Sequence, residues 1–110
     1  MANQTIVIAR VQVEGLHRWP EAFDAVAFLR EAHRHLFHIE ARAVVRHHDR
    51  DIEIIDLGRR IRTYLHDRYG DPLALGVMSC EMLAAELVDV FALHACTVLE
   101  DGENGAEVLA

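Results

Sequence analysis

The chain has 110 residues, 52% of them hydrophobic and 26% charged, which suits one globular domain over residues 1–110 and argues against disorder. Its formal net charge is −7 and its basic residues are scattered arginines, so it lacks the basic patch on which non-specific nucleic-acid binding depends. There is no apolar run of 18 residues, no signal-peptide pattern and no disulfide framework. We therefore expect a soluble, cytoplasmic protein that binds neither nucleic acid nor membranes.

The first predicted element is a β-strand over residues 5–14, because apolar residues occupy every second position from Val7 to Val13. Pro20 cannot donate a ladder hydrogen bond and ends any pairing beyond this strand. A short helix over residues 20–30 follows, since proline is favourable at a first helical position. A long irregular loop is the alternative for this segment.

The second predicted strand covers about residues 35–47 and begins beside a pair of histidines. Residues two apart on a strand point to the same side, so His33 and His35 project together from its start. Two imidazoles on one side of a stiff backbone form half of a zinc site. A third histidine, with His17 the leading candidate, would complete it and leave an open position for water or substrate. The alternative is that two of the eight histidines fall at this spacing by chance.

Two amphipathic helices follow in the second half of the chain. The first is predicted to start at an N-cap, Asp56, and to end near Gly70. Residues 71–76 are predicted to form a loop. The second helix is capped by Ser79 and carries Glu81 in its positive first turn. A third strand over residues 95–100, a turn over 101–105 and a short fourth strand over 106–109 complete the chain.

These elements predict an α+β fold, with a four-stranded antiparallel sheet and two helices on one of its faces. The other face of the second strand mixes apolar residues with charges of both signs, which suits a subunit interface or a wet lumen. Open sheet edges invite pairing with further chains. We therefore expect a homo-oligomer in which sheets join edge to edge into a barrel.

Several short motifs occur in the order found in one enzyme family: His17 after the first strand, His33-Arg34-His35-Leu36-Phe37 at the second, Asp56-Leu57 and Ser79-Cys80-Glu81 at the helix starts, and Glu100 at the end of the third strand. In this pattern the chain resembles the 6-pyruvoyl tetrahydropterin synthase and 6-carboxytetrahydropterin synthase family, as a divergent member. That resemblance covers most of the chain. It implies the tunnelling (T-) fold, with ββααββ order and assembly through sheet edges into a barrel, here as a trimer or hexamer.

The resemblance also implies roles for individual residues. His17, His33 and His35 would bind Zn²⁺, which would polarise oxygen atoms on a ligand's side chain. Glu100 would accept two N–H donors from the amino-pyrimidine edge of a pterin or purine, with Glu81 and Cys80 also binding substrate. Taken alone, Glu100 is a solvated strand-end carboxylate and Glu81 a residue favoured by the helix dipole.

The chain departs from the family at the groups that transfer protons. The family's catalytic cysteine precedes the His-x-His motif, but residues 27–32 read Ala-Phe-Leu-Arg-Glu-Ala. The family's Asp-His pair between the helices is reduced to Asp71, which Pro72 follows; His66 is the candidate to replace the missing histidine. An exposed helix histidine is the alternative for His66. Cys80 could approach the ligand as a thiolate favoured by the helix N-terminus, or be a buried small residue.

Two main functions follow from these expectations. The first is a zinc-dependent carbon–oxygen lyase acting on a dihydropterin triphosphate or related pterin, in a pterin or 7-deazaguanine (queuosine-type) pathway, with altered catalytic groups. The second is a non-catalytic T-fold module that binds zinc and a pterin or purine. An oligomeric interaction protein without a ligand is a third alternative.

Overall fold

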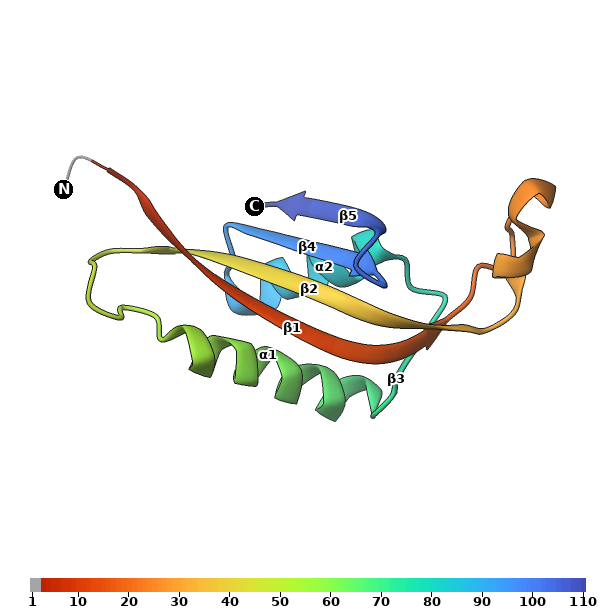
Figure 1. The fold of residues 1–110 in the computed structure, drawn as a ribbon, viewed down its shortest axis with the longest axis horizontal. Helices are drawn as coiled ribbons and strands as arrows, with labels where there is room; N and C mark the ends of the chain where they lie inside the picture. Colours follow the sequence, from red (N-terminus) through yellow and green to blue (C-terminus); the bar gives the residue numbers. More distant parts are fainter. Residues whose placement is uncertain (1–2) are drawn as a thin grey trace.

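The computed structural model describes residues 3–110 and contains one mixed β-sheet with helices packed against it (Figure 1). Its five strands lie in the order β3-β1-β2-β4-β5. The elements in chain order are β1 (Thr5–His17), a 3-10 helix η1 (Asp24–Arg30), β2 (His33–Val45), α1 (Ile54–Tyr69), β3 (Leu73–Gly76), α2 (Cys80–Phe91), β4 (Ala95–Glu100) and β5 (Asn104–Leu109). The α+β class is therefore confirmed.

The prediction of a four-stranded, wholly antiparallel sheet is wrong, because the segment predicted as a loop over residues 71–76 contains β3. This strand pairs in parallel with the end of β1, from Gly15 to His17. Leu73 and Leu75 alternate with exposed neighbours and point into the core, where both are buried. Their burial against the helices stabilises a strand of only four residues.

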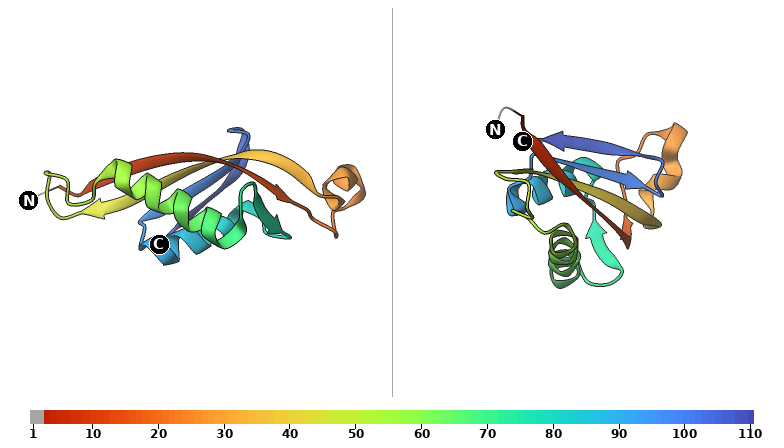
Figure 2. Two further views of the ribbon diagram at one scale, coloured as in Figure 1. Left: turned by 90° about the horizontal axis from the view of Figure 1, so that it is seen from below. Right: turned by 60° about the vertical axis from the view of Figure 1, so that its left-hand side comes forward.

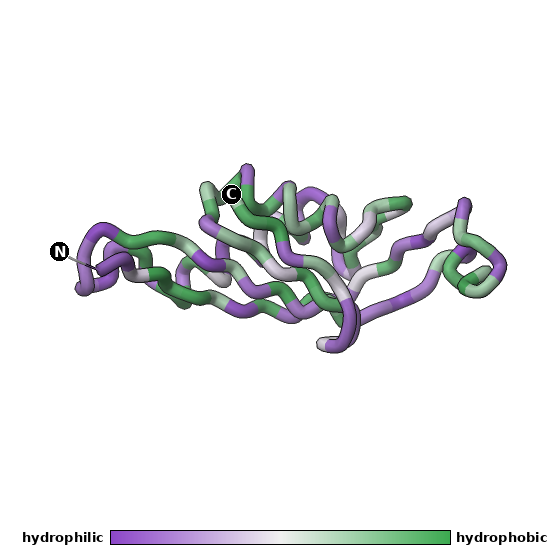
Figure 3. Tube along the Cα trace, turned by 90° about the horizontal axis from the view of Figure 1, so that it is seen from above, coloured by the Kyte–Doolittle hydropathy of each residue, from purple (hydrophilic) through white to green (hydrophobic). Residues whose placement is uncertain are grey.

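The long strands β1 and β2 form an antiparallel hairpin in the middle of the sheet. Its pairing runs from Thr5 opposite Val45 to His17 opposite His33. Alternate side chains of both strands face the helices, and those of Val11 and Ile39 are buried there. The same alternation of hydrophobic and hydrophilic residues is visible along the two strands in Figure 3. β1 ends and β2 begins at the same end of this hairpin, so His17 and His33 lie opposite each other there.

The helices α1 and α2 pack on the same face of the sheet, as predicted (Figure 2). Their buried residues join one core with the inward side chains of β1, β2 and β4. Two tyrosines of α1 also bind α2: the hydroxyls of Tyr64 and Tyr69 donate to the two carboxylate oxygens of Glu86 at 2.7 and 2.6 Å. This contact fixes the two helices relative to each other. The N-terminus of α2 lies beside the histidines, so the helix that borders them is linked to α1.

The predicted helix boundaries have different outcomes. Ser79 caps α2 by accepting from the Met82 N–H, as expected, and α1 ends at Gly70. The N-cap of α1, however, is Glu53 rather than Asp56, because the Glu53 carboxylate accepts the backbone N–H groups of residues 55 and 56. The helix predicted over residues 20–30 is the shorter η1.

The second face of the sheet is open in the single chain and carries mixed polar and apolar side chains. Glu40 lies between Arg10 and Arg42, with N–O distances of 2.9 and 2.8 Å. These two arginines lower the pKa of Glu40, Arg42 through its hydrogen bond most of all. Exposed Ile8 and Leu36 lie on the same face. The chain thus forms an open sheet and not a barrel by itself.

No helix within residues 3–110 is both long enough and apolar enough to cross a membrane.

Candidate metal centre

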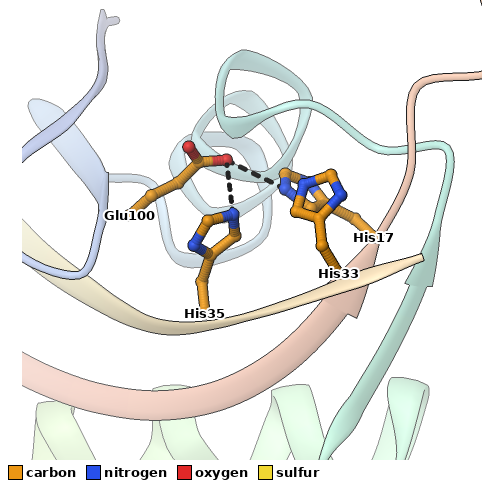
Figure 4. Close-up of side chains that lie close together, drawn as sticks. All are labelled: His17, His33, His35 and Glu100. Carbon is orange, nitrogen blue, oxygen red and sulfur yellow. Dashed lines mark ion pairs between the residues drawn. The ribbon is translucent and has the colours of Figure 1, made fainter. Parts of the chain in front are cut away.

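Three histidines and one glutamate meet at one end of the sheet (Figure 4). His17 is the last residue of β1, His33 and His35 open β2, and Glu100 ends β4. One ligand atom from each of the four side chains lies within 4.8 Å of all the others. The predicted histidine triad is therefore brought together, and the predicted substrate-binding glutamate lies beside it.

The strand pairing explains why these four residues converge. His17 is directly opposite His33 in the β1–β2 ladder, and Glu100 is opposite Phe37 in the β2–β4 ladder. His33 and His35 are two residues apart and so share one side of β2. Three adjacent strands therefore end at the same place with ligand-bearing side chains on the same face.

Each of the three imidazoles is oriented by a hydrogen bond from its Nδ1–H. His17 donates to the Met78 carbonyl and His33 to the Glu31 carbonyl, both at 2.9 Å, and His35 donates to the Asp101 carboxylate at 2.7 Å. Carbonyl and ionised carboxylate oxygens only accept, so the proton must be on each Nδ1. In a neutral ring, a proton on Nδ1 leaves Nε2 with a lone pair, which is the arrangement that metal-binding histidines adopt.

Two of these Nε2 atoms, those of His17 and His35, are buried and have no hydrogen-bond partner among residues 3–110. A buried polar atom without a partner is rare in proteins and calls for a physical explanation. A cation shared by the imidazoles would satisfy both lone pairs. Imidazole nitrogens with one carboxylate suit a first-row transition metal better than Mg²⁺ or Ca²⁺, which prefer oxygen ligands.

A pocket of about 460 Å³ opens beside the four-residue cluster. Its polar lining includes His17, His33 and Glu100, and its walls are largely apolar, formed by Trp19, Leu29, Val77, Met78 and Met82. The volume falls within the range of about 300–1,000 Å³ that is typical of small-molecule sites. The cluster therefore borders a pocket large enough for a bicyclic ligand.

The predicted substrate-binding residues Cys80 and Glu81 line this pocket, because the N-terminus of α2 faces it. The predicted catalytic residues His66 and Asp71 do not line it. They lie near each other, with 3.8 Å between His66 Nε2 and Asp71 Oδ1. Asp71 precedes the start of β3, whereas the residue of β3 that pairs with His17 is Gly76, at the other end of the strand. Within one chain this pair is separate from the pocket.

The surroundings of Cys80 disfavour the activated thiolate that its position at a helix N-terminus could favour. Burial, together with the charges of nearby Glu100 and Glu81, raises the pKa of the Cys80 thiol to about 12. Desolvation favours the uncharged form of a thiol, so this shift favours the protonated thiol at neutral pH. The alternative of a buried small residue fits Cys80, which is 7% exposed.

Asp101 is a site residue that the sequence reading missed, because Asp-Gly after a strand indicates only a turn. Its carboxylate accepts from His35 Nδ1–H and from the Leu36 backbone N–H at 2.9 Å. The hydrogen bond from His35, and then that from Leu36, lowers the pKa of Asp101. The backbone at Asp101 has φ of 55°, a conformation that Asp and Asn adopt more readily than most residues.

Asp101→Asn is expected to lower metal affinity by about 10–100-fold, the usual effect of removing an outer-shell partner of a metal-binding histidine. Asparagine preserves the size and the backbone conformation of the turn, but one amide oxygen cannot accept both protons that the two carboxylate oxygens accept. Competition with a chromophoric chelator measures the change. Asp49→Asn, in a turn at the opposite end of the hairpin, is the control, and equal affinities of the two variants would contradict the role of Asp101.

No family model matches this chain, and no curated protein compared with it matches either. The resemblance to the tetrahydropterin synthases therefore rests on the residues of the site and their order along the chain.

Proposed function

We propose that this protein is a zinc-dependent enzyme of the 6-pyruvoyl/6-carboxytetrahydropterin synthase type, acting on a dihydropterin triphosphate or a related pterin. One observation carries the proposal: three imidazoles, each bonded through Nδ1 to an acceptor, form a cluster with Glu100 in which one ligand atom of each side chain lies within 4.8 Å of the others, beside a pocket. Three histidines with one exchangeable position form a common catalytic zinc site.

Each part of the site has a role in this proposal. His17, His33 and His35 would hold Zn²⁺, which supplies Lewis acidity toward oxygen atoms of the ligand's side chain. Glu100 accepts N–H donors from the amino-pyrimidine edge, which selects pterins and purines over ligands without paired donors. The apolar walls around Trp19 and Leu29 contact the faces of the ring and exclude water.

A homo-oligomer, as a trimer or hexamer with the T-fold, belongs to the same proposal. β3 pairs with only the last residues of β1, so the outer edge of β1 over residues 5–14 is open within the described chain. The outer edge of β5 is the sheet's other end. Two open edges and a second face with exposed Ile8, Leu36 and Val44 support association through the sheet.

A specific observation also favours a second candidate, a non-catalytic module that binds zinc and a pterin or purine. The thiol of Cys80 is protonated, and His66 and Asp71 lie outside the pocket of the single chain. The pocket therefore contains the proposed metal centre and the proposed ring-binding carboxylate, but apart from these ligands and carboxylates no general base among residues 3–110 lines it. Proton transfer by a positioned base contributes about 10²–10⁴-fold to rate.

Incubation of the zinc-loaded protein with dihydroneopterin triphosphate, followed by mass spectrometry, separates the two candidates. If the wild-type protein converts the side chain of the pterin and His33→Ala does not, the protein is an enzyme. Binding without conversion, weakened in Glu100→Gln, establishes the module. If the protein with full metal occupancy neither binds nor converts dihydroneopterin triphosphate, both candidates are refuted.

A further inference from the structure

We propose that Glu100 is a fourth metal ligand, which closes the coordination sphere until an incoming ligand displaces it. This inference rests on the metal centre of the proposed function and assigns Glu100 a role in addition to ring binding. It starts from one distance: Glu100 Oε2 lies 2.9 Å from His17 Nε2 and 3.5 Å from His35 Nε2 (Figure 4).

An ordinary hydrogen bond does not account for this approach. The Nδ1 of His17 and that of His35 already carry protons, so the Nε2 atoms of the neutral rings have lone pairs that repel a carboxylate oxygen. A protonated Nε2 would donate to Glu100, yet neither atom has the geometry of a hydrogen bond to it. A cation shared by nitrogen and oxygen removes the repulsion without requiring that geometry.

The distances agree with ligands arranged around one ion. Ligands bonded at 2.0–2.1 Å in a tetrahedron are separated from each other by about 3.3 Å, and the two observed separations of 2.9 and 3.5 Å lie on either side of that value. The fourth group, His33, is within 4.8 Å of the other three. The separations of Glu100 Oε2 from two of the imidazoles thus fit ligands that share one ion, with His33 close to them.

A site with four protein ligands differs in function from one with three. Four ligands close the sphere, as in structural zinc sites, whereas three leave the position that a catalytic ion needs. The carboxylate of Glu100 cannot bind the ion through Oε2 and also offer both oxygens to a ring edge. Entry of the ring would therefore withdraw the carboxylate from the ion and open the fourth position in the same movement.

Azide binding to the Co²⁺-substituted protein tests this inference without any pterin. The visible bands of Co²⁺ change when an anion enters its coordination sphere, so titration with azide reports whether the fourth position is available. Glu100→Gln replaces a carboxylate by a poor ligand and is expected to raise azide affinity at least tenfold. It is also expected to lower the affinity for Co²⁺.

Glu81→Gln is the matched control, because Glu81 lines the same pocket and its loss removes the same negative charge. A gain in azide affinity confined to Glu100→Gln supports ligation. Equal gains in both variants would show that only charge repulsion was relieved and would overturn the inference, while leaving the metal centre intact. Failure of the wild-type protein to bind Co²⁺ would overturn the inference and the metal centre together, whereas an error in the pterin assignment does not affect this result.

Discussion

Replacing His17 with alanine is expected to reduce metal affinity by more than the roughly 100-fold upper value for loss of an outer-shell partner. His17 would supply the only ligand that β1 contributes to the proposed centre, and it is 9% exposed. Without it, two histidines from one strand and a carboxylate remain, and a solvent-filled gap replaces the buried ring. Chelator competition with Zn²⁺ gives the affinity, and thermal unfolding with and without metal gives an independent measure.

His38→Ala is the matched control for this prediction. His38 lies on β2, like two of the proposed ligands, but an odd number of residues from them, so it points to the other face of the sheet. Its replacement is expected to leave metal affinity within about threefold of wild type, since surface changes away from such features usually alter free energies by less than about 0.5 kcal/mol. A His17→Ala variant with near wild-type affinity would disprove the metal centre.

Gly105→Ala is expected to destabilise the protein by about 3 kcal/mol or more, at or above the usual range for an overpacked site. A Cβ at Gly105 would lie 1.8 Å from the carbonyl oxygen of Val98 and 2.8 Å from the Leu99 Cα. These are backbone atoms of the paired strand β4, so no side-chain rotation can relieve the contact. The strands β4 and β5 would have to separate beside Glu100, which pairs with Asn104.

Gly58→Ala introduces the same methyl group where there is room for it. Inside α1 the new Cβ would meet only Val11 Cγ1, at an ordinary 3.7 Å. Alanine is more favourable than glycine in a helix by up to about 1 kcal/mol, so this variant should be more stable than wild type. Urea unfolding of both variants measures the two effects, and a Gly105→Ala variant as stable as wild type would show that β4 and β5 are not paired this closely.

The parts of the fold that could be predicted from the sequence are those with a local period. Alternation of apolar residues located β1 and β2, and the spacing of His33 and His35 placed both rings on one side of β2. Placing His17 and Glu100 at the same site required the order of motifs along the chain, because their approach to the other two histidines depends on pairing between distant strands. The structure brings all four together as that order suggested.

The parts that could not be predicted depend on contacts far apart in sequence. β3 is too short for its alternation to stand out between Pro72 and the following loop, and its parallel pairing with β1 becomes visible only in three dimensions. The acceptors for His17 and His33 are backbone carbonyls of Met78 and Glu31. Backbone groups carry no sequence signal, so the orientation of the rings could not be inferred.

The meeting of three strand ends at the histidines has a consequence that does not depend on catalysis. A bound ion would cross-link β1, β2 and β4 where the hairpin otherwise opens into the long connection over residues 18–32. Ligand binding to the folded state alone adds about 2.7 kcal/mol of stability at a concentration 100 times the dissociation constant. The four side chains would then stabilise the sheet whether or not the protein catalyses a reaction.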